Sequence, residues 1–465
     1  MKMARVMLAA PSSGSGKTLI TCGLLKLLKD KGYGLCAFKC GPDYIDPMFH
    51  SKVLGLKSRN LDSFFTKPDV LCALMERDAE GADIAVVEGV MGYYDGLSGF
   101  SLKASSYDVA DITQTPVILI VNCAGMSLSV IPYIKGFLEY RENSHIKGVI
   151  LNRLSPSLYK RMKEKIEEEL DVKVFGYVPE LSFALESRHL GLVMPGEIED
   201  LKEKLSGLAD VLSKTLEIDE IIKLARSAPN LKADKEILSG LSLWSGLRGA
   251  KDEPLKIGLA RDEAFCFFYE DNLKLLRDMG AELMEFSPLH DEHLPDGING
   301  LLLYGGYPEL YAEGLSGNVR MRDEIKAAAL SGMPIMAECG GFMYLHESMQ
   351  AEDGKHYPMA GVIKGTVNKK DKLTRFGYIT LSGGKAFGKE AGEIFSHEFH
   401  YYDSENCGDA FLAKKPLSER SWQSMHSTDT MLCGYPHLYY CGNEKPAAAF
   451  MEAVLKYKKG RSVYC

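Results

Sequence analysis

The chain has 465 residues, enough for two or three domains, and its 46% hydrophobic and 25% charged residues are typical of a globular protein. Its net charge of -8 argues against nucleic acid as a partner, because phosphate backbones are bound by clustered Lys and Arg. No apolar run approaches the roughly 18 residues that a membrane-spanning helix needs, so we expect no membrane partner.

The first half alternates short apolar runs with helical patterns, which predicts a parallel β-sheet covered by helices on both faces. The expected strands are Arg5–Ala10, Gly34–Phe38, Ile84–Glu88, Val117–Val121, Gly148–Leu151 and Val174–Val178. Helices are expected between them, for example over Thr18–Lys31 and Leu128–Glu142. We assign residues 1–218 to this first domain.

The pattern weakens over residues 219–254, where Pro and Gly interrupt charged residues, and we expect a linker there. A second α/β domain is predicted over 255–465. Its expected elements are the strands Leu255–Ala260, Glu282–Phe286, Gly300–Tyr304 and Pro334–Ala337, the helix Tyr269–Met279 and a final helix over Ala447–Lys458. From Tyr357 onward the sequence is richer in β-patterns.

The cysteines indicate the compartment. There are eleven, with no C-x-x-C pair, and Cys22, Cys36, Cys72 and Cys123 lie inside apolar runs. Buried thiols without regular spacing are typical of a reducing environment. We therefore expect a cytoplasmic protein.

A glycine-rich segment between the first strand and the first helix predicts a nucleotide site. It reads Pro-Ser-Ser-Gly-Ser-Gly-Lys-Thr over residues 11–18, a phosphate-binding loop with Pro11 in place of the first glycine. In such a loop the backbone N–H groups turn toward phosphates, the lysine reaches phosphate oxygens and the threonine hydroxyl can bind Mg²⁺. The predicted ATP-binding residues are Ser13, Gly14, Ser15, Gly16, Lys17 and Thr18.

Carboxylates near the ends of strands are candidates for holding Mg²⁺ beside ATP. Glu88 closes an apolar strand, and Asp43 and Asp46 follow the second strand in a loop constrained by Gly and Pro. With Thr18, these acids form the candidate magnesium set. The alternative for Asp43 and Asp46 is that they only cap the turn.

A cysteine in a tight turn predicts a second chemical site. The apolar run 334–337 ends at Glu338 and leads into Cys339-Gly340-Gly341 and a helical pattern. The turn exposes the sulfur, and a helix N-terminus favours the thiolate. Backbone N–H groups of Gly340 and of Gly306, in a second Gly-Gly turn, can form an oxyanion hole. The residues alone leave the base open among His437, His397 and His400.

Together these segments resemble the cobyrinic acid a,c-diamide synthase family, glutamine-dependent amidotransferases of corrinoid biosynthesis. The resemblance rests on APSSGSGKT, FKCGPDYIDPMFH, EGVMGYYDG, ESRHLGL, ARDEAFCFFYEDNL, LLYGGYPELY, AECGGFMYL and SHEFHYY, which span both halves in order. It implies an α/β protein with an N-terminal P-loop parallel-sheet domain similar to dethiobiotin synthetase. The C-terminal domain is expected to be similar to class I glutamine amidotransferases.

The resemblance also implies the reaction and its residues. ATP would phosphorylate the a- and c-acetate carboxylates of cobyrinic acid, and ammonia from L-glutamine would displace the phosphate. Cys339 would be the nucleophile and His437 its base; Asp43, Asp46 and Glu88 would serve Mg-ATP. Tyr44 and Asp95 match loop residues that handle the corrinoid. A homodimer is compatible with this family.

Two positions depart from the wider glutaminase pattern. Tyr439 stands where the base motif carries a glutamate two residues after the histidine, and Met343 stands where many such domains have glutamine. Both match the cobyrinate branch. We therefore expect a Cys-His dyad.

Alternative functions remain at this point. Hydrogenobyrinic acid and nickel-sirohydrochlorin are alternative acceptors, because the motifs do not distinguish ring or metal. The KCGPDYIDP loop and the chain length disfavour cobyric acid synthase. A regulatory P-loop ATPase of the positioning type would carry a further lysine where Pro11, Ser12 and Ser13 stand, and would not need Cys339 and His437.

Overall fold

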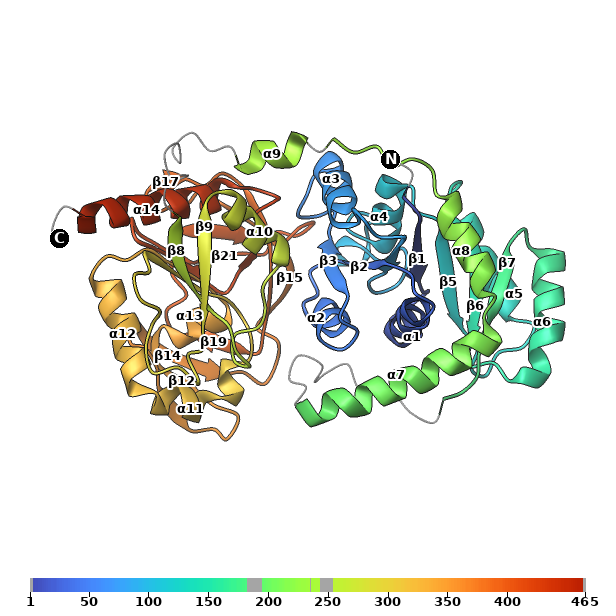
Figure 1. The fold of residues 1–465 in the computed structure, drawn as a ribbon, viewed down its shortest axis with the longest axis horizontal. Helices are drawn as coiled ribbons and strands as arrows, with labels where there is room; N and C mark the ends of the chain where they lie inside the picture. The colour runs from blue at the N-terminus through green and yellow to red at the C-terminus, as the bar shows by residue number, and fades with distance from the viewer. Residues whose placement is uncertain (1–2, 182–194, 235, 243–253, 463–465) are drawn as a thin grey trace. The chain divides into compact units, whose positions relative to one another are not determined.

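The computed structural model describes residues 3–181, 195–234, 236–242 and 254–462. The chain divides into two compact units, Met1–Ile237 and Leu238–Cys465 (Figure 1). In the part of the chain that is described, no helix combines the length and apolar character needed to cross a membrane.

The first unit is built on a seven-stranded sheet in the order β3-β2-β4-β1-β5-β6-β7. Every neighbouring pair is parallel. The strands are β1 (Arg5–Ala9), β2 (Leu35–Cys40), β3 (Lys57–Leu61), β4 (Ile84–Glu88), β5 (Val117–Asn122), β6 (Ile146–Asn152) and β7 (Lys173–Val178). The carboxyl ends of β1, β2 and β4 therefore meet at one edge of the sheet.

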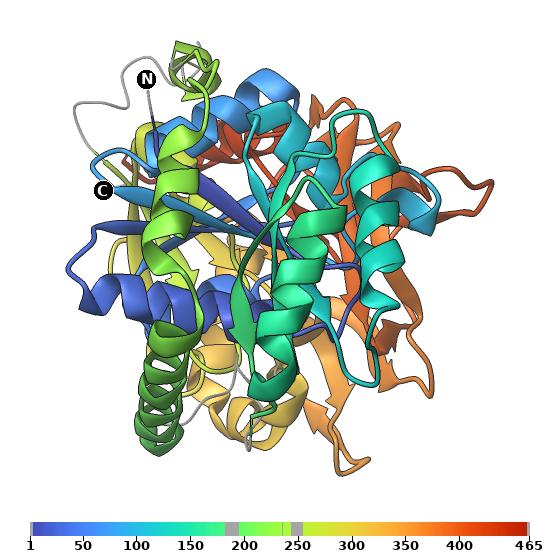
Figure 2. The same ribbon diagram turned by 90° about the vertical axis from the view of Figure 1, so that its right-hand side faces the viewer.

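Helices cover both faces of this sheet, because alternate residues of each buried strand point to opposite sides. On β1, Val6 and Leu8 belong to the core shared with one helix set, and Met7 and Ala9 to the core shared with the other. The first set is α1 (Lys17–Asp30), α2 (Ile45–Lys52), α7 (Pro195–Thr215) and α8 (Ile218–Ser227). The second is α3 (Pro68–Asp78), α4 (Ser106–Thr113), α5 (Val130–Glu139) and α6 (Pro156–Glu169). Figure 2 shows the strands of this unit between its helices.

The second unit contains a six-stranded sheet in the order β22-β23-β11-β10-β8-β9. Only the β22–β23 pair of this sheet is antiparallel. The strands are β8 (Leu255–Ala260), β9 (Ala281–Phe286), β10 (Gly300–Leu303), β11 (Ile335–Glu338), β22 (His426–Ser427) and β23 (Met431–Gly434). The helices are α10 (Glu270–Asp278), α11 (Ala312–Gly317), α12 (Val319–Leu330), α13 (Gly340–Tyr344) and α14 (Lys445–Ser462), with the short η4 (Pro308–Leu310).

Smaller sheets complete the second unit and confirm the β-rich tail. A five-stranded antiparallel sheet contains β15 (Arg375–Ser382), β18 (Ile394–His400), β20 (Phe411–Lys414), β21 (Ser421–Ser424) and β24 (His437–Leu438). A second sheet contains β12 (His346–Gln350), β13 (His356–Pro358), β14 (Ile363–Lys369) and β19 (Tyr402–Ser404), and β16 (Lys385–Ala386) pairs with β17 (Lys389–Glu390). The β18–β24 register places His397 opposite His437.

All ten strands predicted by their ranges are present, with ends within two residues of the prediction. The apolar pattern does not predict β3, whose residues Lys57-Ser-Arg-Asn-Leu61 are mostly polar, as an edge strand allows. The structure also differs in the stretch expected to be a linker, 219–254. Its first residues belong to α8, where Ile221, Ile222 and Ala225 are buried against the first unit. The short helix α9 (Glu236–Ser242) follows, and the division between units falls at 237/238.

Candidate functional site

The glycine-rich loop joins β1 to α1, as the sequence predicts. Gly14 and Gly16 have φ angles of 76° and 92°, a left-handed conformation that glycine adopts without strain. A β-carbon on Gly16 would also lie 2.4 Å from Nδ2 of Asn152. The same amide of Asn152 donates a hydrogen bond of 2.9 Å to the carbonyl of Ser15. The loop is therefore held against the end of β6 at a place where only glycine fits.

Lys17 and Thr18 are the first two residues of α1, and their side chains bind different partners. The Lys17 ammonium donates to the carbonyl oxygens of Met91 at 2.5 Å and of Ser12 at 3.3 Å. The Thr18 hydroxyl donates to Oε1 of Glu88 at 2.6 Å. Burial, aided by the neighbouring Lys39 charge, lowers the pKa of Lys17 to about 8. A phosphate anion at the loop would counter that effect.

A buried charge cluster lies beside this loop. Lys39 on β2 and Glu88 on β4 are register partners, and the ammonium donates to Oε1 of Glu88 at 2.8 Å. Lys39 also forms an ion pair with Asp46 of α2. Nε2 of His50 lies 3.5 Å from Oε2 of Glu88. The structure therefore brings Thr18, Asp46 and Glu88 to one place.

Lys39 and Glu88 stabilise each other's charge, whereas burial and the neighbouring Glu88 charge raise the pKa of Asp46 well above its usual value. Burial works against the ammonium of Lys39, but the carboxylates of Glu88 and Asp46 outweigh it and raise its pKa well above the ordinary value. Burial likewise opposes the charge of Glu88, and the Lys39 ammonium outweighs it and lowers the pKa of that carboxyl. Glu88 is therefore ionised although it is fully buried.

The oxygen donors fit a magnesium ion that also binds phosphate. Oε2 of Glu88 has no hydrogen-bond partner among the described residues, and Oε1 meets the Thr18 hydroxyl. No cluster of three or more His, Cys, Asp or Glu side chains that could hold a metal is found in the described ranges. Mg²⁺ usually keeps waters and takes one or two carboxylates plus substrate phosphates, so a site made by Thr18, Glu88 and Asp46 would not require a larger cluster.

The other predicted residues of this unit lie in two loops. Oδ1 of Asp43 accepts from the backbone N–H groups of Ile45 at 2.8 Å and of Asp46 at 3.3 Å, so Asp43 caps the start of α2. Tyr44 is the adjoining residue and is buried. In the loop after β4, Oδ2 of Asp95 accepts from the N–H of Gly92 at 3.1 Å. Both acids therefore also have structural roles in their turns.

In the second unit, Cys339 lies at a sharp turn between β11 and α13. Its backbone has φ 46° and ψ -106°, a sparsely populated conformation that costs about 1–3 kcal/mol and occurs at functional turns. The turn is fixed because the N–H of Cys339 donates to the carbonyl of Gly434 at 2.8 Å. A β-carbon on Gly341 would lie 1.9 Å from the carbonyl oxygen of Leu303, so α13 packs closely on β10 only without a side chain there.

His437 and Cys339 face a common point at Gly305. A β-carbon on Gly305 would lie 2.7 Å from Cε1 of His437 and 3.5 Å from Cβ of Cys339. The backbone nitrogen of Gly306 lies 3.1 Å from the position that a β-carbon on Gly340 would take. The structure thus gathers the predicted nucleophile, base and oxyanion donors at one end of the sheet.

Burial dominates the ionisation of this site. Burial raises the pKa of the Cys339 thiol above its ordinary value, and the nearby charge of Glu309 raises it further. The Gly340 N–H opposes this, but α13 has only five residues and does not reverse it. The Gly340 N–H at the start of α13 thus favours the thiolate, as expected, but burial has the larger effect on the pKa of Cys339. The thiol needs a base.

A buried carboxyl lies next to His437. Oε2 of Glu338 is 3.7 Å from Nδ1 of His437. Burial raises the pKa of Glu338 well above its usual range, although the Leu438 N–H and the Tyr440 hydroxyl oppose the rise. Burial lowers the pKa of His437 well below its ordinary value.

The two other candidate histidines differ in their distance from the base. The ring of His397 stacks on that of His437, with centroids 4.8 Å apart and an interplanar angle of 22°. His400 stacks on Tyr435 at 3.8 Å, and its Nε2 lies 3.3 Å from Oε2 of Glu398. His397 thus contacts His437 directly. His400 instead contacts Tyr435, Tyr402 and Glu398.

Sequence reasoning missed several residues that shape the sites. Lys39, Asn152 and Glu338 are polar residues at or near the carboxyl ends of buried strands. A polar residue at the end of an apolar strand was also the feature that pointed to Glu88, so the same feature could have pointed to Lys39, Asn152 and Glu338. His50 gave no comparable signal, because it lies within α2.

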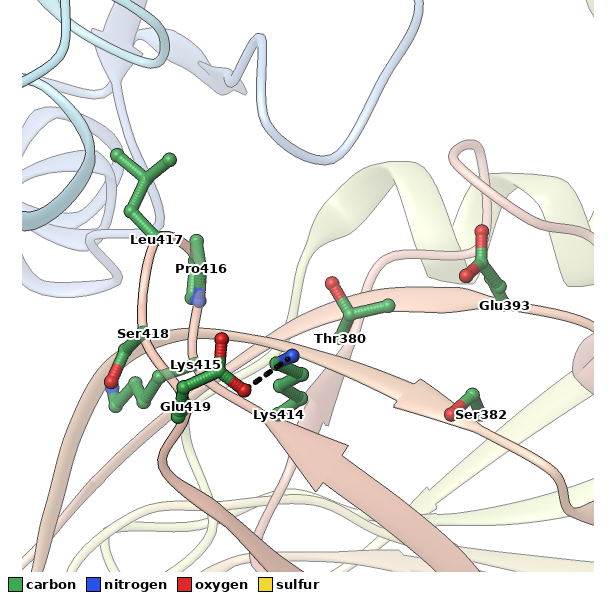
Figure 3. Close-up of a pocket in the computed structure, with 9 residues that line it drawn as sticks. All are labelled: Thr380, Ser382, Glu393, Lys414, Lys415, Pro416, Leu417, Ser418 and Glu419. Atoms are coloured by element: carbon green, nitrogen blue, oxygen red, sulfur yellow. Dashed lines mark hydrogen bonds and ion pairs between the residues drawn. The ribbon is translucent and has the colours of Figure 1, made fainter.

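A solvent-open pocket of about 420 Å³ lies elsewhere in the second unit (Figure 3). It is lined by residues of β15 and of the β20–β21 hairpin, among them Thr380, Ser382, Lys415 and Ser418, and Lys414 pairs with Glu419 at 3.3 Å on its wall. None of the residues predicted for catalysis lines it.

Two family profiles match the chain, one in each half. Residues 6–192 match the CobQ/CobB/MinD/ParA nucleotide binding domain, and residues 256–444 match the CobB/CobQ-like glutamine amidotransferase domain. The first range contains the P-loop cluster and the second contains Cys339 and His437.

Curated relatives match nearly the full chain. A protein of Priestia megaterium named cobyrinate a,c-diamide synthase is 35% identical, over 99% of this chain and 99% of its own length. A protein of the same name from Listeria innocua is 38% identical, over 95% of this chain and 97% of its own. A third protein of this name, from Archaeoglobus fulgidus, is 34% identical, over 98% of this chain and 99% of its own length.

Proposed function

The chain belongs to the cobyrinate a,c-diamide synthase family, and we propose that it converts cobyrinic acid to the a,c-diamide with ATP and L-glutamine. As a family member it is a glutamine-dependent amide-forming ligase of cobalamin biosynthesis with a nucleotide-binding domain. One observation carries the proposal. Over the full length of its relatives, the chain combines a P-loop that meets Glu88 with a strained Cys339 beside His437.

The synthetase half of the proposed reaction activates a carboxylate. An oxygen of the a- or c-acetate group attacks the γ-phosphorus of ATP, the bond to the leaving ADP oxygen breaks, and an acyl phosphate forms. Lys17 and the loop N–H groups hold the phosphates, and Lys39 offsets the negative charge of the buried acids. Magnesium, held by Thr18, Glu88 and Asp46, would neutralise charge on the phosphates.

The glutaminase half supplies ammonia. His437 takes the thiol proton, and the Cys339 thiolate attacks the side-chain carbonyl of glutamine while Gly306 and Gly340 N–H groups stabilise the oxyanion. The C–N bond breaks as the leaving nitrogen takes the proton from His437, and water then releases glutamate from the thioester. Ammonia attacks the acyl phosphate carbon, and phosphate leaves.

The proposal includes the setting of the reaction. Nine of the ten cysteines in the described residues are buried, which fits a cytoplasmic enzyme. Hydrogenobyrinic acid and nickel-sirohydrochlorin are the alternative acceptors, because the sequence motifs do not distinguish ring or metal.

Cys339→Ser tests the proposal most directly. With cobyrinic acid and ATP, we expect wild-type protein to form mono- and diamide from either glutamine or high ammonium chloride, measured by mass spectrometry and ADP release. The variant should use ammonium chloride alone. Full glutamine-driven turnover by Cys339→Ser would show that Cys339 is not the nucleophile. If the wild-type protein formed no product from cobyrinic acid with either nitrogen donor, cobyrinic acid would not be the acceptor. The two other macrocycles are assayed in parallel.

A further inference from the structure

A buried glutamate lies against the proposed base without a full set of partners. Glu338 ends β11 directly before Cys339 and is 2% exposed. Its Oε2 lies 3.7 Å from Nδ1 of His437, and its Oε1 has no hydrogen-bond partner within the described part of the chain. Burying a carboxyl that is only partly paired is costly, so its place here calls for a function.

Tyr439 stands at the position where the wider glutaminase pattern has a glutamate, and its side chain is bonded to another part of the fold. The hydroxyl of Tyr439, two residues after His437, donates to Oδ2 of Asp271 on α10 at 2.8 Å. The backbone N–H of Tyr440 donates to Oδ1 of Asn272 on the same helix at 2.8 Å. These bonds anchor the segment after β24 to α10. An acid reaches His437 instead from the strand that carries the nucleophile.

We propose that Glu338 is the positioning residue for His437, completing a Cys339–His437–Glu338 relay from the residue before the nucleophile. The proposal rests on the roles proposed above for Cys339 and His437. In the proposed relay, the 3.7 Å separation between Nδ1 of His437 and Oε2 of Glu338 shortens to a hydrogen bond from Nδ1–H to the carboxylate, which leaves Nε2 as the nitrogen that accepts the thiol proton. In that step the S–H bond breaks, the proton binds Nε2, and the imidazolium is paired with the carboxylate.

The buried environment of His437 would make a Cys339–His437 dyad without a third residue inefficient. Burial disfavours an imidazolium at His437, and the neighbouring His397 and His400 disfavour it further. Burial also disfavours the carboxylate of Glu338. The two penalties offset when Glu338 is ionised as the thiol proton reaches His437, because each buried charge is then the partner of the other.

Glu338→Gln tests this role, because it keeps the shape of the side chain and removes its charge. For glutamine-driven amidation we expect kcat to fall at least about 10-fold, with the KM for glutamine nearly unchanged. The ammonia-driven rate should not change. Alkylation of Cys339 by iodoacetamide, followed on its peptide by mass spectrometry, should slow by a similar factor. Glu338→Asp should keep a larger part of the glutamine-driven rate than Glu338→Gln.

Two further variants separate the outcomes. Tyr439→Phe removes a buried hydrogen bond and should lower the melting temperature without lowering kcat. Cys339→Ser reports on the proposed function itself: if it keeps glutamine-driven activity, that function fails. If Cys339→Ser is inactive with glutamine but Glu338→Gln has the wild-type kcat, only the relay is overturned. Faster alkylation of Cys339 in both Glu338 variants, as an opened site would give, would assign Glu338 a purely structural role and overturn it as well.

Discussion

The hydroxyl of Thr18 and the carboxylate of Glu88 are joined by a hydrogen bond of 2.6 Å, which connects the first turn of α1 to the end of β4. The same carboxylate oxygen accepts from Lys39 at 2.8 Å. The phosphate loop and the centre of the sheet are thus coupled through one buried anion. Loss of that anion should affect every reaction that uses ATP.

Glu88→Gln should therefore lower ADP release and amide formation with either nitrogen donor, because activation of the carboxylate precedes both. The amide keeps the shape but leaves Lys39 without its charge partner, and we expect a loss on the order of 100-fold. The matched control is Glu180→Gln, which removes an acid that is exposed and paired with Arg153 on the surface. If Glu88→Gln turned over ATP at the wild-type rate, Glu88 would have no role in the ATP site.

Gly305→Ala should block the glutaminase and spare the synthetase. The added methyl would lie 2.7 Å from Cε1 of His437, within the space between that ring and Cys339. Displacing a catalytic side chain by about 1 Å can cost on the order of 100-fold. We expect glutamine-driven amidation to fall by about that factor while the ammonia-driven rate is retained.

Gly317→Ala is the matched control for that substitution, because nothing lies within 4 Å of the added methyl. It should leave both rates unchanged. An equal fall of the glutamine- and ammonia-driven rates in Gly305→Ala would indicate general misfolding rather than a blocked site.

The sequence predicts those parts of the protein that depend on local pattern. The strands of the parallel sheets are fully buried, so their apolar runs are continuous and their ends are visible, as at β4 and β8. The same pattern places Glu88 and Cys339 at strand ends. It fails at β3, where an edge strand has polar residues.

The remaining features depend on long-range pairing that local patterns do not encode. His437 reaches Cys339 because β24 pairs with β18 and because Cys339 is anchored to Gly434 on the neighbouring strand. Local patterns therefore could not distinguish among the three candidate histidines, and the fold favours His437 by placing it near Cys339. Glu338 acquires its significance only when His437 is placed 3.7 Å away.

The stability of the second unit should fall in mild acid because of buried histidines. His346 is enclosed between the carbonyl of Phe342 at 2.9 Å and the hydroxyl of Ser404 at 2.6 Å, and burial lowers its pKa to about 4. The unfolded chain takes up this proton near pH 6.5, but the folded chain does not until about pH 4. The free energy of unfolding should therefore decrease as the pH falls between these values, by up to about 1.4 kcal/mol per pH unit.

Urea unfolding of wild-type protein and His346→Gln at pH 7, 6 and 5 measures this contribution. The variant should be less stable at pH 7 but should lose less stability than the wild type as the pH is lowered. His356→Gln replaces an exposed histidine of the neighbouring strand β13 and serves as the control. Parallel slopes for wild type and His346→Gln would show that this residue does not carry the effect.

The loop from Met91 to Gly96 offers a test of how the acceptor is distinguished. It lies against the phosphate loop, because Lys17 donates to the carbonyl of Met91 at 2.5 Å and a β-carbon on Gly92 would lie 2.6 Å from the carbonyl oxygen of Pro11. Ligands of parallel sheets bind at the carboxyl ends of the strands, so we expect this loop to face the acceptor near the γ-phosphate. The charge of Asp95 can then separate a free carboxylate from a neutral amide by repulsion.

We therefore predict that Asp95→Asn changes which mono- or diamide accumulates under limiting glutamine more than it changes the KM for ATP. Asparagine keeps an oxygen that can accept from the N–H of Gly92, as Asp95 does at 3.1 Å, so the turn is retained while the charge is lost. Asp95→Ala removes both and provides the comparison. Mass spectrometry of the intermediates separates the two roles. An unchanged intermediate pattern in Asp95→Asn, together with a lower melting temperature, would mean that Asp95 serves only to hold the turn.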